Sequence, residues 1–250
     1  MTIALLHGFT GSPASFDDLL LGPSIAIPLT GHGALDGAAD FRGEVDRIAA
    51  MLPGRCHLVG YSMGARIALG VLVEHPDLVE RATLISVNPG LSSAVDRVAR
   101  ADADAVWIHL LERHGIAAFT AAWEALPLWK SQRSLPAVAL ARQRRIRLSH
   151  DPRDIADAVR ALGLATMPDY GPRLADIDVP VHLIAGERDT KFRALADPMR
   201  AQLSQARVSL VPDCGHNPVL EAPGLTAALI LERNHHDRME SRPGLRRHPV

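Results

Sequence analysis

Three residues of this sequence have the types and the chain order expected of a serine nucleophile and its base: Ser62, Asp189 and His216. A serine hydroxyl needs a base to lose its proton near neutral pH, and an imidazole held by a carboxylate supplies one. Each residue follows a short apolar run that predicts a β-strand. Because strand ends of an open α/β sheet gather at one edge, we expect the three side chains to meet there.

The serine lies in a G-x-S-x-G pattern that spans residues 60–64. A β-prone run at residues 56–59 precedes the pattern, and residues 65–73 follow with the apolar spacing of a helix. Strand, sharp turn and helix form the context of a nucleophile elbow, which exposes the serine Oγ above the sheet. A Cβ at either glycine would collide with a neighbouring strand or helix. The helix behind Ser62 would also direct free N–H groups towards a developing anion.

Two backbone amides are expected to bind negative charge that develops on a substrate oxygen. An apolar run at residues 3–6 predicts a strand, and the H-G-F-T-G-S sequence after it is similar to a loop that supplies an oxyanion-hole amide. We therefore predict an oxyanion hole from the amides of Phe9 and Met63, worth about 3–4 kcal/mol per donor. His7 and His32 each adjoin a glycine, which favours a structural role in a turn over a catalytic one.

Asp189 and His216 also have structural interpretations. Asp189 could be the N-cap of a helix that begins at Thr190. His216 could be a structural histidine in a loop. The joint occurrence of the elbow, the H-G-F loop and two polar residues at strand ends favours the catalytic interpretation.

The elements that must position these residues alternate between strand and helix. Strands are predicted at residues 3–6, 25–29, 56–59, 81–87, 179–185 and 207–211, and helices at residues 13–21, 41–52, 65–73 and 223–231. This order predicts an α/β fold with a mostly parallel sheet of about six strands.

Residues 92–170 interrupt the alternation because they are rich in Ala and Arg, have a helical period and contain no convincing strand. A segment of about 80 residues is far longer than an ordinary crossover, so we predict a helical lid there. Residues 1–91 and 171–233 would then form the core. Residues 234–250 are polar and basic, and we expect a disordered tail.

The composition is that of one large soluble domain, with 47% apolar residues and a formal net charge of −1. That charge gives no indication of a nucleic-acid or membrane partner. Cys56 and Cys214 form neither a disulfide framework nor a metal-ligand spacing. With no signal-peptide pattern and no membrane-length apolar stretch, we expect a cytoplasmic monomer or small homo-oligomer that acts on a small molecule without a cofactor or metal.

From residue 3 to about residue 231 the chain resembles the α/β-hydrolases. More narrowly, it resembles the 2-succinyl-6-hydroxy-2,4-cyclohexadiene-1-carboxylate synthases of menaquinone biosynthesis. The matching stretches are residues 6–12, 60–66, 88–91, 123, 126–129, 186–192 and 215–221. The arginine after the elbow and the G-E-R-D-x-K-F run discriminate best, since the elbow alone indicates only the fold.

The resemblance implies a lyase that eliminates pyruvate from a substrate with several carboxylates. Ser62, activated by His216, would remove a ring proton, and no acyl-enzyme is required. Arginine suits such a substrate because its planar fork binds a carboxylate through two hydrogen bonds. By the resemblance, five more residues match carboxylate-binding arginines or other pocket residues: Arg66, Arg100, Arg144, Tyr61 and Trp123. Arg100 and Arg144 have other arginines nearby, so a solvated helix face is an equal alternative for both.

A carboxylesterase or C–C bond hydrolase is the alternative function, because the same triad would serve it through nucleophilic catalysis. The two functions differ in the pocket: an esterase favours an apolar acyl pocket, whereas the lyase needs cations for carboxylates. A binding module on a hydrolase scaffold is a third possibility. It is disfavoured because all three triad positions are filled.

Overall fold

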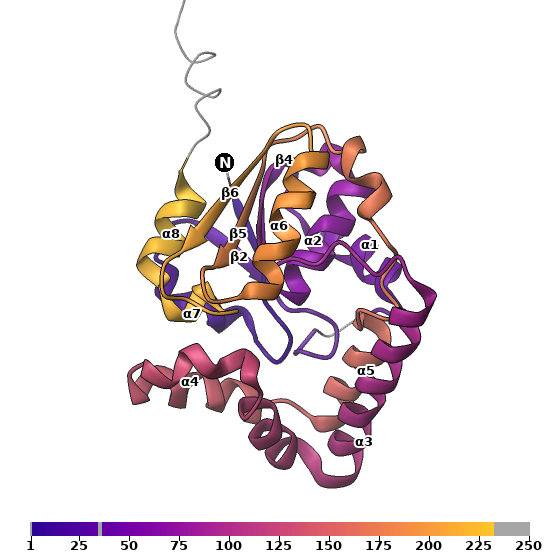
Figure 1. Ribbon diagram of the computed structural model, residues 1–250, viewed down its shortest axis with the longest axis vertical. Helices are drawn as coiled ribbons and strands as arrows, with labels where there is room; N and C mark the ends of the chain where they lie inside the picture. Colours follow the sequence, from indigo (N-terminus) through magenta and orange to yellow (C-terminus); the bar gives the residue numbers. More distant parts are fainter. Residues whose placement is uncertain (1, 35–36, 233–250) are drawn as a thin grey trace, which may run out of the picture.

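The structure, a computed structural model, describes residues 2–34 and 37–232 (Figure 1). Six strands form one sheet in the order β2-β1-β3-β4-β5-β6, and each neighbouring pair is parallel. They are β1 (Ile3–Leu6), β2 (Ser24–Ile27), β3 (Cys56–Tyr61), β4 (Val79–Ile85), β5 (Val181–Gly186) and β6 (Ala206–Val211). The predicted α/β fold with about six strands is confirmed, with ends shifted by one or two residues.

Helices cover both faces of the sheet (Figure 1). One layer contains α1 (Phe41–Met51), α2 (Met63–Glu74) and α6 (Thr190–Gln202), and the other contains η1 (Pro13–Leu19), α7 (Pro218–Glu221) and α8 (Pro223–Leu231). Successive side chains of a strand point to opposite faces of the sheet, so each strand contributes to both cores. In β1, Ala4 and Leu6 pack in the first core, and Ile3 and Leu5 pack in the second.

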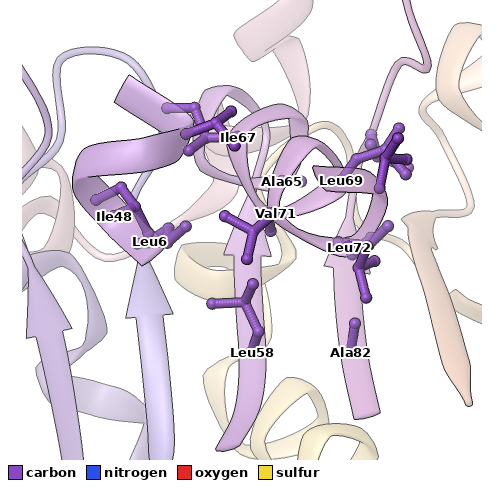
Figure 2. Close-up of a cluster of buried hydrophobic side chains, with 14 of the residues drawn as sticks. Leu6, Ile48, Leu58, Ala65, Ile67, Leu69, Val71, Leu72 and Ala82 are labelled. Carbon is purple, nitrogen blue, oxygen red and sulfur yellow. The ribbon is translucent and has the colours of Figure 1, made fainter. Parts of the chain in front are cut away.

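The larger core lies between the sheet and α2. Figure 2 shows Leu58 of β3 and Ala82 of β4 pointing towards that helix, close to Val71 and Leu72. These four side chains are at most 2% exposed. The helix is apolar nearly all round because the sheet and α1 both pack against it, and this burial fixes the end from which the elbow projects.

The helix predicted at residues 13–21 forms as a shorter 3-10 helix, η1. Ser12 and Pro13 begin it as expected. It ends at Leu19 because Leu20 adopts a left-handed backbone conformation with φ 47°. A short 3-10 turn, η2 (Pro76–Leu78), likewise follows α2.

The segment between β4 and β5 contains helices and no strand among its described residues. Its elements are α3 (Ala94–Glu124), which kinks at Gly115, then η3 (Pro127–Ser134), α4 (Ala137–Leu148), α5 (Pro152–Leu162) and η4 (Gly171–Asp176). In Figure 1 α3, α4 and α5 lie together below the sheet and its helices. Leu162, Met167 and Tyr170 pack into the larger core, so lid and core share residues. The domain boundaries at residues 92 and 170 stay predictions.

The predicted tail at residues 234–250 lies outside the described residues. Among the helices of residues 2–34 and 37–232, none combines the length and the apolar character needed to cross a membrane.

Candidate active site

Ser62 occupies the sharp turn between β3 and α2, with φ 52° and ψ −107°. The two glycines of the motif make this turn possible. A Cβ on Gly60 would lie 2.5 Å from the Gly64 carbonyl oxygen, and a Cβ on Gly64 would lie 2.1 Å from the Leu6 carbonyl oxygen. Both distances are too short for real atoms. The strained turn is therefore held by close packing of α2 against β1 and β3.

The structure brings Ser62, His216 and Asp189 together at the sheet edge. The Oγ of Ser62 lies 3.0 Å from Nε2 of His216, and Nδ1 of His216 lies 2.8 Å from Oδ2 of Asp189. Asp189 also accepts a hydrogen bond from the Phe192 backbone N–H at 3.3 Å through Oδ1, which caps α6. The capping and imidazole-orienting interpretations of Asp189 are thus compatible, because each uses a different oxygen.

Aromatic rings surround the His216 imidazole. Its ring centroid lies 4.5 Å from that of Phe192 and 5.7 Å from those of Tyr61 and Trp129. Behind it, the Ser86 hydroxyl donates a hydrogen bond to the His216 carbonyl oxygen at 3.1 Å. His216 as a whole is 3% exposed, so its imidazole is held in place and shielded from water.

The two backbone amides expected in the oxyanion hole are those of Phe9 and Met63. Within the described part of the chain, the Phe9 and Met63 backbone N–H groups donate no hydrogen bond. Met63 is the first residue of α2, where a helix leaves its N–H groups free. Their use in catalysis stays a proposal.

His7 and His32 hold the loop that carries Phe9. Nε2 of His7 accepts from the Leu29 backbone N–H at 3.2 Å, and Nε2 of His32 accepts from the Thr10 backbone N–H at 3.0 Å. Burial lowers the pKa of His7 to about 4 and also lowers the pKa of His32, so both rings are neutral near pH 7. These contacts give both histidines a structural role in positioning the loop.

A cavity of about 170 Å³ lies over the triad, between core and lid; we name it the catalytic cavity. Of the residues singled out from the sequence, it is lined by Ser62, His216, Phe9, Met63, Tyr61, Arg66, Arg100 and Trp123. The Trp123 ring packs against Phe9 and Phe119, so it also supports the lid. The structure thus brings together residues from the core strands, α2, α3 and the two loops.

Three cationic residues line the catalytic cavity. Arg66 is buried, and its guanidinium donates to the Leu162 carbonyl oxygen at 2.9 Å. Burial lowers the pKa of Arg66 to about 9. Arg100 donates to Asp104 Oδ1 at 2.9 Å. The third cation, Lys191, was not singled out from the sequence, although it lies inside the G-E-R-D-x-K-F run.

Arg144 does not line the catalytic cavity. It lies on an exposed part of α4 and pairs with Glu124. The buried arginine of this run is Arg147, which also pairs with Glu124, at 3.0 Å, and lies 5.2 Å from the Trp129 ring centroid. Since α4 has no distinct apolar face, its sequence could not indicate which arginine turns inward.

Comparison with known proteins gives consistent matches. The family model described as the alpha/beta hydrolase family matches residues 3–229. A Bacillus subtilis (strain 168) protein with the provisional name 2-succinyl-6-hydroxy-2,4-cyclohexadiene-1-carboxylate synthase is 33% identical over 243 residues, with 92% of this chain and 89% of that protein covered. An Enterobacter sp. (strain 638) protein named as the same synthase is 28% identical, with 92% and 90% covered. A solved structure of MenH from S. aureus has a TM-score of 0.88 at 30% identity and 92% coverage of each chain.

Proposed function

The chain belongs to the alpha/beta hydrolase family and, within it, to the 2-succinyl-6-hydroxy-2,4-cyclohexadiene-1-carboxylate synthases, and we propose that it eliminates pyruvate from the succinyl-cyclohexene-carboxylate intermediate of menaquinone synthesis. One observation carries the proposal beyond the family. The cavity over Ser62 is lined by three cationic side chains, from Arg66, Arg100 and Lys191. The named product has two carboxylates and pyruvate has a third, so the substrate offers one carboxylate for each cation.

The triad acts as a base in this reaction. Ser62 Oγ removes a ring proton as its own proton passes to His216 Nε2, which lies 3.0 Å away. Asp189 orients the imidazole and stabilises the imidazolium. The electrons of the broken C–H bond form a new ring double bond, the double bond already in the ring shifts by one position, and the ring C–O bond breaks at its new end. The leaving oxygen departs as the enolate of pyruvate, which gains one proton on carbon.

The oxyanion hole stabilises the negative charge that proton removal creates. That charge spreads onto the carbonyl oxygen of the succinyl group, which activates the ring proton. The backbone amides of Phe9 and Met63 bind this oxygen, and each contributes about 3–4 kcal/mol in comparable sites. The hydrogen bonds from His7 and His32 hold the Phe9 loop in place, so little reorganisation is needed during the reaction.

A carboxylesterase or C–C bond hydrolase is the second candidate, because the distance from Ser62 to His216 suits nucleophilic attack equally well. Its acyl group would have to lie against the charged groups of Arg66 and Arg100. Arg100 is paired with Asp104, but Arg66 has no carboxylate partner among the described residues, and desolvating its charge against an apolar acyl group is unfavourable, which supports the lyase.

A paired assay tests the proposal. Purified protein is mixed with the pathway intermediate, and released pyruvate is followed by lactate dehydrogenase and NADH oxidation; short-chain p-nitrophenyl esters are assayed in parallel. We expect rapid pyruvate release and slow ester hydrolysis. Efficient ester hydrolysis without pyruvate release would refute the lyase and favour the esterase. The cytoplasmic location and the monomeric or small homo-oligomeric state stay predictions from the sequence.

A further inference from the structure

A second cavity adjoins the triad on the side of the lid turn η3. It has a volume of about 680 Å³ and is lined by residues of η3, of the loops after β5 and β6, and of the first turn of α6; we name it the vestibule. Leu128, Lys191 and His216 line both the vestibule and the catalytic cavity. The two spaces therefore meet beside the imidazole.

The vestibule is positively charged. Its basic side chains are Lys130, Arg133, Arg188 and Lys191. Arg188 pairs with Asp213 at 2.6 Å, and the one acidic residue on the wall, Asp189, is paired with His216. Within residues 2–34 and 37–232, the other three basic side chains form no ion pair. An anion in this space would meet net positive charge.

Lys191 differs from the two arginines of the catalytic cavity. Arg66 donates to a backbone carbonyl and Arg100 is paired with Asp104, whereas the Lys191 ammonium has no hydrogen bond or ion pair with any described residue. Its Nζ lies 5.5 Å from the centroid of the Phe192 ring, whose centroid lies 4.5 Å from that of His216. Lys191 is exposed as a residue, but desolvation of its ammonium at the cavity wall, and then the positive charge of Arg100, lower its pKa. The negative charge of a bound carboxylate would oppose this shift and favour the charged ammonium.

We propose that Lys191 binds the carboxylate of the group that leaves as pyruvate. This inference rests on the proposed function and names the cation for one of the three carboxylates. The catalytic cavity opens into the larger vestibule beside His216, which gives the departing group a way out, so its carboxylate belongs at that opening. Lys191 also suits this role because negative charge grows on the leaving enolate, next to that carboxylate, during C–O cleavage.

Chemical labelling can follow Lys191 individually because lysines are rare in the amino-acid sequence. The sequence contains two lysines, Lys130 and Lys191, and both line the vestibule. Wild-type protein is treated briefly with acetic anhydride, with and without pyruvate, and acetylation at each lysine is measured by mass spectrometry. At pyruvate about tenfold above its Kd, we expect ~10-fold slower acetylation of Lys191. Lys130 should be unaffected, and neutral pyruvamide should protect neither lysine. Equal acetylation of Lys191 with and without pyruvate would overturn the proposal.

Kinetics of Lys191→Gln test the catalytic consequence. Loss of one charge-assisted contact should lower kcat for pyruvate release ~10- to 150-fold and raise the pyruvate inhibition constant. Lys191→Arg should restore part of kcat. Arg200→Gln is the matched control, because it removes one exposed positive charge from the same helix, and it should behave as wild type.

The two proposals fail in different ways. If wild-type protein releases no pyruvate from the intermediate, the proposed function fails whatever Lys191 does. If wild-type protein releases pyruvate and Lys191→Gln retains its kcat and its pyruvate inhibition constant, only the role of Lys191 fails.

Discussion

Replacement of Arg66 by methionine should weaken catalysis without weakening the fold. Arg66 is 8% exposed. Its guanidinium donates to a backbone carbonyl but has no carboxylate within hydrogen-bond distance among the described residues. Burial lowers its pKa from 12.5 to about 9, which corresponds to roughly 5 kcal/mol of unfavourable free energy for the charged form. Such a cation destabilises the folded state at neutral pH.

The sign of this effect follows from proton linkage. Between pH 9 and 12.5 the unfolded chain would hold the Arg66 proton more tightly than the folded chain, so folded-state stability rises with pH there and is lowest, for this group, below pH 9. Methionine removes the charge and fills similar volume. It also leaves the Leu162 carbonyl oxygen without its donor, at a cost of about 1–3 kcal/mol. The difference between these two terms is a gain, so we expect the free energy of unfolding to rise by about 2–4 kcal/mol.

Catalysis should change in the opposite direction. Without one charged hydrogen-bonding partner for a substrate carboxylate, kcat/KM for pyruvate release should fall ~10- to 150-fold, whereas slow ester hydrolysis should stay the same or increase. Urea unfolding and the lactate dehydrogenase assay measure the two effects on the same preparation. A loss of more than about 2 kcal/mol of stability, with lyase and esterase activities falling together, would refute this reasoning and make Arg66 a structural residue.

Three further predictions follow from the site. Ser62→Ala and His216→Ala should each lower kcat at least ~10³-fold, because each removes a step of proton transfer; near-normal lyase turnover in either variant would contradict the mechanism. Arg144→Gln should leave kcat/KM within about twofold of wild type, since the exposed pair with Glu124 is worth at most ~1 kcal/mol and lies away from the catalytic cavity; a large loss in the same assay would restore it to the substrate site. The free energy of unfolding should fall by ~3 kcal/mol between pH 6.5 and 4 through His7 alone, because its folded-state pKa is about 4 and the unfolded chain takes up the proton first; urea titrations of wild type and His7→Asn across this range should converge.

Local patterns were sufficient for most of the fold and for the convergence of Ser62, Asp189 and His216. Strand ends and the G-x-S-x-G glycines depend on contacts within a few residues, or on the general rule that strand ends meet at one edge. The 3-10 form of η1 depends instead on the left-handed conformation of Leu20, which no apolar period encodes. The inward arginine of α4 was equally hidden, because Arg147 is selected by Trp129 and Glu124 from other elements.

The burial of Asp104 in the catalytic cavity could not be predicted from the sequence. Asp104 lies one helical turn after Arg100, which from sequence alone indicates an ordinary surface ion pair. In the structure the carboxylate is buried and lines the catalytic cavity, and its Oδ2 has no partner in the described part of the chain. Burial raises the pKa of Asp104, whereas Arg100 opposes that shift. The protonation state of Asp104 therefore depends on Arg100.

This pairing determines which cations a substrate reaches most easily. A carboxylate that approaches Arg100 must compete with Asp104, which already accepts its Nε hydrogen bond at 2.9 Å. Arg66 and Lys191 donate no hydrogen bond to a carboxylate among the described residues, so a substrate carboxylate can form a charge-assisted hydrogen bond with either one. Asp104 thus holds Arg100 in the same cavity as Arg66 and Lys191, and the charge of Arg100 acts on both. A cavity built this way favours a substrate with separated carboxylates over a simple ester, and that is the electrostatic case for elimination at Ser62.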